Sequence, residues 1–354
     1  MMKKAISVIQ RDSNVELLRI ISMILVLITH ACYVSLGPPT YNDIAGSFAS
    51  SLMRSLSESL SDVGVNTFIL ISGWFGIRSR MGRFMEFVFQ IYFIEIVLYV
   101  TMRVLGLTEA MGMDGWLELF FFRYGTYWFI KAYIVLYVFA PILNAFTETC
   151  SRKQLRYFLI SFYIVQSVYG FYINTGWFSS GYSPLSFIGL YILGRYMHLY
   201  PNQFTKFDKF VDLTLYLMVA LITALFSLAM TYFFGKVGTA LFKNSCPLMI
   251  ISSVYFFLFF TKISLRSKVV NWLSASCFAV YLIHCTPFIF YPYYIDFIRN
   301  FYKTESLFPF FVFTSALIAL FFVLSIMFDK VRIGAWKFLK YYYYRIVSTY
   351  DKAY

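Results

Sequence analysis

The chain has 354 residues, with 60% hydrophobic and only 13% charged residues, and it carries 30 Lys and Arg against 17 Asp and Glu. A soluble globular protein has about 25% charged residues. The composition therefore excludes an ordinary soluble enzyme, a disordered chain and a small secreted domain held by disulfides. The formal net charge of +13 does not indicate nucleic-acid binding, because basic residues also accumulate in the cytoplasmic loops of membrane proteins.

Long apolar runs follow one another through the chain. A membrane-spanning helix needs about 20 mostly apolar residues, and the second and sixth of the runs are short for one. The first run has no cleavage pattern after it, so we do not expect a signal peptide. In chain order, the ten candidate spans are 17–36, 62–77, 84–105, 127–146, 155–173, 184–200, 211–234, 247–262, 269–291 and 308–328.

The distribution of basic residues supports this count and orients the chain. If the N-terminus is inside, the inner segments hold 21 of the 30 Lys and Arg and the outer segments hold 6. Such a bias indicates an even number of spans with both termini cytoplasmic. We therefore predict an all-α integral membrane protein of one domain. It has a cytoplasmic segment over 1–16, a bundle of about ten transmembrane helices over 17–328, and a basic, aromatic cytoplasmic tail over 329–354.

The first span contains two ionisable side chains, Arg19 and His30, which are costly in a membrane and usually functional. They are eleven residues apart, about 20° past three full turns, so they share one helix face roughly 16 Å apart along the axis. Each alone is explained by snorkelling or helix packing. Together they favour a cation for a phosphate or carboxylate and a deeper imidazole base or nucleophile. Glu16, one turn earlier, is expected to pair with Arg19 or orient it.

Each of three other polar residues inside the predicted spans has either a structural or a functional interpretation. His284 falls in the outer half of the ninth span, where it either packs structurally or faces His30 across the bundle. Lys131, near the outer end of the fourth span, either snorkels outward or lies at an acceptor site. Ser72, followed by Gly73, marks a close helix approach or a local unwinding.

The remaining polar residues give structural predictions. Glu95 lies in the middle of the third span, and Arg103, near the same face, is its predicted ion-pair partner. The five cysteines form no CxxC pair and are interpreted as small buried hydrophobic residues, so no metal site is predicted. The sequence contains no P-loop, GxGxxG, DxD or HExxH motif, which disfavours ATP-driven transport, Rossmann chemistry and zinc proteolysis.

Four segments in order resemble the membrane acyltransferase-3 family. The family opens with an acidic residue, then Leu-Arg, then ten residues and a histidine, and Glu16, Arg19 and His30 take these places. Glu16 replaces the commoner Asp, and Ile20 replaces a common Gly. The other matches are an SG-aromatic motif at 72–74, a span bearing Trp128 and ending in Pro at 127–141, and a late YLIH segment at 279–287.

The resemblance implies a bacterial cell-membrane O-acyltransferase that takes acetyl from cytoplasmic acetyl-CoA. The acceptor is expected to be a hydroxyl of a surface polysaccharide or of its lipid-linked precursor. Some family members carry an extracytoplasmic hydrolase-like domain. None is expected here, so the chain completes the transfer itself or hands over to a separate extracytoplasmic transferase. By this resemblance, Arg19 and His30 are the essential pair. We further expect Arg19 to bind the phosphates of CoA.

We expect acyl-CoA, a glycan acceptor and membrane lipid as partners, with no nucleic acid and no permanently bound cofactor. Two alternatives remain: a transporter or flippase of a lipid-linked glycan that uses the histidines as a proton relay, and an acyltransferase with a lipid acceptor. The residues expected to support the essential pair are Glu16, His284, Lys131, Ser72 and Trp128.

Overall fold

The computed structural model describes residues 12–120, 127–235 and 238–350, and within them every regular element is a helix. Seven helical segments are long and apolar enough to cross a membrane, as expected for a multi-pass membrane protein. These seven are Ser13–Val34, Met81–Val104, Trp128–Thr149, Lys209–Phe234, Gly238–Thr261, Lys268–Cys285 and Phe308–Tyr343.

The elements include α-helices, three π-helical turns and three short 3-10 turns. In chain order they are α1 (Ser13–Thr29), η1 (His30–Val34), α2 (Tyr41–Gly46), α3 (Phe48–Ser61), α4 (Val63–Phe75), α5 (Met81–Val104), α6 (Met113–Leu119), α7 (Trp128–Thr149), α8 (Arg152–Gln166), η2 (Ser167–Tyr172), η3 (Ser179–Gly181), α9 (Pro184–Leu199), η4 (Gln203–Thr205), α10 (Lys209–Phe234), η5 (Gly238–Phe242), α11 (Pro247–Thr261), α12 (Lys268–Ser274), α13 (Cys277–Cys285), α14 (Pro287–Ile289), η6 (Phe290–Ile295), α15 (Asp296–Thr304) and α16 (Leu307–Tyr350).

The predicted count of ten spans is not confirmed. The predicted spans 62–77, 155–173 and 184–200 correspond to α4, α8 and α9, which are not among the seven segments. With 13 and 16 residues, α4 and α9 are shorter than the roughly 20 residues of a full crossing. They are nevertheless interior helices, because they pack along each other and α4 also packs on α1 and α11.

The contact between α4 and α9 is unusually close. A Cβ atom on Gly73 of α4 would lie 2.1 Å from the carbonyl oxygen of Tyr191, and one on Gly194 of α9 would lie 2.5 Å from that of Leu70. Only glycine permits such an approach of two helix backbones. The close helix approach predicted at Ser72–Gly73 is therefore confirmed, and it holds Ser72 at a fixed place in the bundle.

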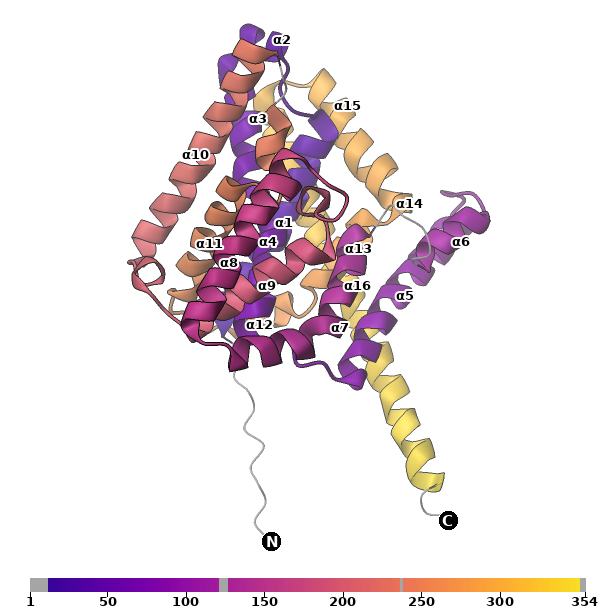
Figure 1. Ribbon diagram of the computed structural model, residues 1–354. Helices are drawn as coiled ribbons and strands as arrows, with labels where there is room; N and C mark the ends of the chain where they lie inside the picture. Colours follow the sequence, from indigo (N-terminus) through magenta and orange to yellow (C-terminus); the bar gives the residue numbers. More distant parts are fainter. Residues whose placement is uncertain (1–11, 121–126, 236–237, 351–354) are drawn as a thin grey trace.

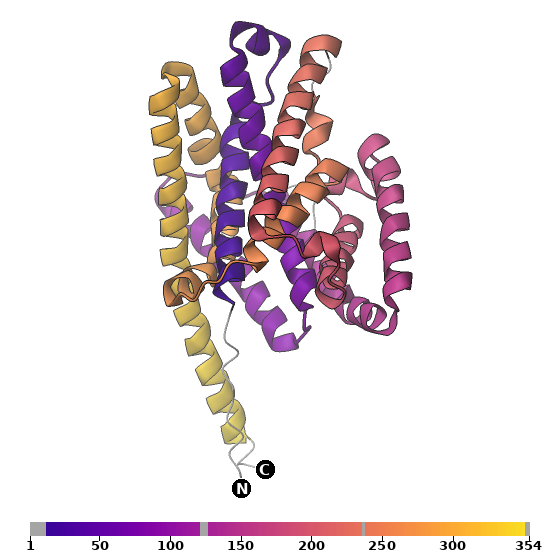
Figure 2. The ribbon, with the colours of Figure 1, turned by 90° about the vertical axis from the view of Figure 1, so that its left-hand side faces the viewer.

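The bundle is arranged around α1. This helix contacts α3, α4, α11, α12, α13 and α16. Along one edge α3 and α10 lie side by side, while α5 and α16 lie on the opposite side (Figure 1). In Figure 2, α1 begins and α16 ends at the same end of the bundle.

The last helix is longer than the predicted span over 308–328. α16 continues without interruption from Leu307 to Tyr350, across the expected boundary between span and tail at 328/329, and its final part extends beyond the bundle (Figure 2). Asp329 and Arg332 are buried against α5, where Gln90 donates to Asp329 at 3.1 Å. This buried network keeps the start of the expected tail within the bundle. Residues 1–11 and 351–354 of the expected terminal segments lie outside the described residues.

Candidate functional site

A pair of hydrogen-bonded histidines lies in the middle of the bundle. His30 is the first residue of the π-helical turn η1, directly after α1, and π-turns inside α-helices are frequent at functional sites. Its Nδ1 is 2.9 Å from Nε2 of His284, which is fully buried on α13. The structure thus agrees with the expectation that His284 faces His30 across the bundle.

The hydrogen bonds determine which ring nitrogens carry protons. His284 Nδ1 lies 2.7 Å from the carbonyl oxygen of Val280, so it must donate, and the Nε2 of the neutral ring is then an acceptor. His30 Nδ1 therefore donates to His284 Nε2, and the lone pair of neutral His30 is on Nε2. The Cys285 thiol is 3.3 Å from His284 Nε2, but a thiol is the weaker donor for that site. No residue in the described parts of the chain hydrogen-bonds to His30 Nε2.

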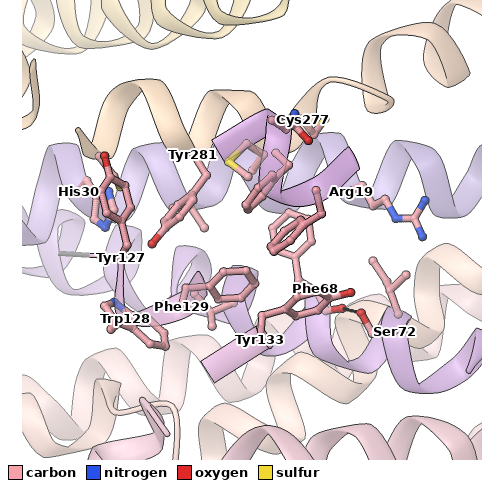
Figure 3. A pocket seen from close by; sticks show the side chains of 18 of the residues that line it. Arg19, His30, Phe68, Ser72, Tyr127, Trp128, Phe129, Tyr133, Cys277 and Tyr281 are labelled. Atoms are coloured by element: carbon pink, nitrogen blue, oxygen red, sulfur yellow. Dashed lines mark hydrogen bonds between the residues drawn. The ribbon is translucent and has the colours of Figure 1, made fainter. Parts of the chain in front are cut away.

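Arg19 and His30 line the same cavity, of about 690 Å³. Figure 3 shows Arg19 at one end and His30 at the other, with aromatic side chains between them. The 3.6-residue periodicity of α1 places both side chains on this wall, roughly 16 Å apart along the helix axis. The labelled lining residues between them are Phe68, Ser72, Trp128, Phe129, Tyr133, Cys277 and Tyr281.

The guanidinium of Arg19 is held by a buried carboxylate. Its Nη1 donates to Glu16 Oε1 at 2.7 Å, and the hydroxyl of Ser274 donates to the other oxygen of Glu16. Glu16 is 6% exposed, whereas the Arg19 side chain is 35% exposed. The carboxylate thus orients the guanidinium, as the sequence suggested. Arg19 has five N–H donors, and Glu16 accepts from one of them.

Of the other residues predicted to support the essential pair, some line the Arg19–His30 cavity and one does not. Ser72 and Trp128 line the Arg19–His30 cavity, and the Ser72 hydroxyl donates to the carbonyl of Phe68 at 2.9 Å. Lys131, one turn into α7, is half-buried and is not among the residues that line this cavity or the second one described below.

Sequence reasoning missed a buried hydrogen-bonded group beside the histidines. Glu95 was paired with Arg103, which is wrong: the Tyr127 hydroxyl donates to Glu95 at 2.6 Å and the Thr286 hydroxyl at 3.1 Å. Tyr127 also lines the Arg19–His30 cavity and has a left-handed backbone, with φ of 65°, which is uncommon outside glycine and asparagine. The only signal in the sequence was a single acid in mid-span, because its partners belong to other elements.

A second cavity, of about 390 Å³, meets the first one at His30. Val26, His30, Val65 and Trp128 line both cavities. The second cavity is also lined by Glu58 and Asp62 at the end of α3 and by Tyr182, Lys243 and Asn244 from the connections around α9 and α11. It is therefore much richer in polar side chains.

Three side chains at the histidine pair offer ligand atoms suitable for a metal ion. The ligand atoms of His30, His284 and Cys285 lie within 4.8 Å of one another. We predicted no metal site from the sequence. The helical repeat of a single segment does not show that Cys285 lies near His30, which belongs to another helix. The distances between these atoms are also those of ordinary hydrogen bonds, which account for the arrangement of the two rings.

Most of the chain matches the model of a known protein family. Residues 12–330 match a family model, Acyl_transf_3, described as an acyltransferase domain. The match covers 319 of the 354 residues and includes α1 and both histidines of the pair. No curated protein and no solved structure matches the chain.

Proposed function

Because the chain belongs to the membrane acyltransferase-3 family and is a multi-pass membrane acyltransferase, we propose that it transfers acetyl from acetyl-CoA to a glycan hydroxyl. The acceptor is a cell-surface polysaccharide or its lipid-linked precursor, and the membrane is the bacterial plasma membrane with both termini in the cytoplasm. The observation that carries the proposal is the single cavity that both Arg19 and His30 line.

The donor enters this cavity from the Arg19 end. A guanidinium is permanently charged and binds phosphate through its planar set of donors. Arg19, oriented by Glu16, binds a phosphate group of CoA at the cytoplasmic mouth. The slim pantetheine arm then lies among the aromatic side chains of the cavity and carries the thioester towards His30.

The reaction at His30 is a general-base acyl transfer. Nε2 accepts the proton of the acceptor hydroxyl while the oxygen attacks the thioester carbonyl carbon. The new C–O bond forms, the C–S bond breaks, and the CoA thiolate takes the proton back from the imidazolium. His284 accepts the Nδ1–H of His30 throughout and keeps the lone pair on Nε2. The same lone pair is the nucleophile if acetyl passes first to His30, and a brief pulse of labelled acetyl-CoA without acceptor distinguishes the two routes.

The function is tested with the full-length protein in sealed proteoliposomes containing [14C]acetyl-CoA and cell-envelope glycan. We expect label in the glycan, and glycan from a deletion strain should lack the corresponding acetyl groups by mass spectrometry. Movement of a lipid-linked glycan without consumption of acetyl-CoA would instead indicate a flippase. Label in the phospholipid would indicate a lipid acceptor.

Substitutions of His284 test its positioning role. A glutamine side chain can place an oxygen acceptor near the position of His284 Nε2, whereas leucine cannot accept a hydrogen bond. We expect His284→Leu to lower kcat by about 10²-fold and His284→Gln to retain activity within about fivefold. Acetyl transfer is measured in proteoliposomes at matched protein content. Equal losses in the two variants would contradict the positioning role, since a merely structural effect has no reason to follow hydrogen-bond acceptance.

A further inference from the structure

The second cavity contains an acidic pair that the proposed chemistry does not use. Glu58 and Asp62, about one helical turn apart at the end of α3, both line this cavity and are close enough for their charges to interact, and the Thr29 hydroxyl, next to His30 in sequence, donates to the neighbouring Ser61 at 2.8 Å. Glu58 is only 2% exposed, yet its Oε2 has no hydrogen-bond partner in the described part of the chain. A buried carboxyl oxygen without a hydrogen-bond partner is costly, so its presence at a cavity wall indicates a ligand that hydrogen-bonds to it.

The protonation of this pair suits hydroxyl groups. α3 is not one of the seven membrane-spanning segments. Burial, together with the neighbouring Asp62, raises the pKa of the Glu58 carboxyl, so the two carboxyl groups hold a proton between them. Such a pair offers both a donor and several acceptor sites. A sugar hydroxyl is likewise a donor and an acceptor, so neighbouring hydroxyls can match the pair.

The lining of the second cavity also includes aromatic rings. The rings of Trp128 and Tyr182 have centroids 4.6 Å apart and planes inclined at 76°, and both residues line this cavity. Aromatic rings bind the apolar C–H faces of a sugar while the polar edges are free to reach the hydrogen-bonding groups. Among the described residues of the lining, Lys243 alone is cationic, and it is accompanied by two carboxyl groups. This balance disfavours a carboxylate or phosphate beside Glu58.

We propose that the second cavity is the acceptor site of the acyltransferase, and that it binds an uncharged sugar ring whose hydroxyls bond to Glu58 and Asp62. This inference rests on the proposed function, because it takes the acyl-transfer reaction at His30 from it. The two cavities meet at His30, so donor and acceptor approach the same imidazole from different cavities. A hydroxyl bound at Glu58 and Asp62 belongs to a ring that can present a neighbouring hydroxyl to His30 Nε2.

The experiment measures sugar binding without any donor. Saturation-transfer NMR is recorded on full-length protein in nanodiscs with methyl β-D-glucopyranoside, methyl β-D-glucuronide or glycerol 3-phosphate. We expect a signal for the uncharged glucoside and weaker signals for the two anions. Glu58→Leu should weaken glucoside binding at least about tenfold, and Glu58→Gln should weaken it less. Glu109→Gln is the control, since Glu109 is exposed and lines neither cavity.

A second variant separates this inference from the proposed function. Arg19→Ala should retain glucoside binding while losing affinity for acetyl-CoA, and acetyl-CoA binding to Glu58→Leu reports that this variant is folded. Unchanged glucoside binding in Glu58→Leu, preference for an anionic probe, or no signal with any probe would each overturn the acceptor assignment. Glucoside binding that depends on Glu58 in a protein that never consumes acetyl-CoA would refute the proposed function and leave the sugar site standing.

Discussion

Replacing His30 with alanine is expected to lower the kcat of acetyl transfer by about 10²- to 10⁴-fold, the range for loss of a general base. The structure supplies the reason: the lone pair of neutral His30 is on Nε2, and His30 is one of the four side chains that line both cavities. The measurement is transfer of [14C]acetyl from acetyl-CoA to glycan in proteoliposomes. The KM for acetyl-CoA should change little, because the phosphate-binding cation is roughly 16 Å away along α1.

His198→Ala is the matched control for this substitution. His198 is exposed at the end of α9, where its ring contacts Trp74, and it lines neither cavity. It should therefore transfer acetyl at the wild-type rate. If His30→Ala inserts, folds and transfers acetyl as fast as the wild type, then His30 is not the base and the catalytic proposal fails.

Replacing Arg19 with alanine is expected to raise the KM for acetyl-CoA by about 10- to 100-fold, because hydrogen bonds to charged groups contribute about 1.5–3 kcal/mol. The kcat at saturating donor should fall much less, since Arg19 is distant from the reacting carbonyl. Arg19→Lys should show an intermediate KM, because an ammonium keeps the charge and loses the planar set of donors. Initial rates over a range of acetyl-CoA concentrations give both constants.

Replacing Arg19 also leaves the buried Glu16 carboxylate without its ion-pair partner, so this effect needs a control. Glu16 is buried and paired with Arg19, so removing the arginine leaves an uncompensated charge. The double variant Glu16→Gln, Arg19→Ala removes both charges and should show the same high KM. If the double variant recovers the wild-type KM, the effect belongs to the stranded carboxylate, and Arg19 does not bind the donor.

The class of protein was predictable from composition, whereas the number of full crossings was not. Little charge and many long apolar runs require a helical membrane protein. However, α4 and α9 are as apolar as spans and shorter, and their Gly73 and Gly194 bring them into contact inside the bundle. An apolar run has the same composition whether it faces lipid or protein, so hydropathy alone does not separate a spanning helix from a buried short one.

In the candidate site too, some contacts could be predicted from the sequence and others could not. The placement of Glu16, Arg19 and His30 on one side of α1 follows from the helical repeat. The assignment of Arg103 to Glu95 used that repeat as well, and it was wrong because Tyr127 and Thr286 approach from other segments.

The sequence by itself determined a helical membrane protein and the relations between side chains within one helix, because backbone hydrogen bonds impose the same rise and rotation on every residue. The tertiary structure alone decided the free nitrogen of His30, the neighbours of Glu95, and the meeting of the acidic pair Glu58 and Asp62 with Trp128. These contacts join segments far apart in the chain. Their geometry depends on how many side chains interlock between helices, and no periodicity within one segment encodes it.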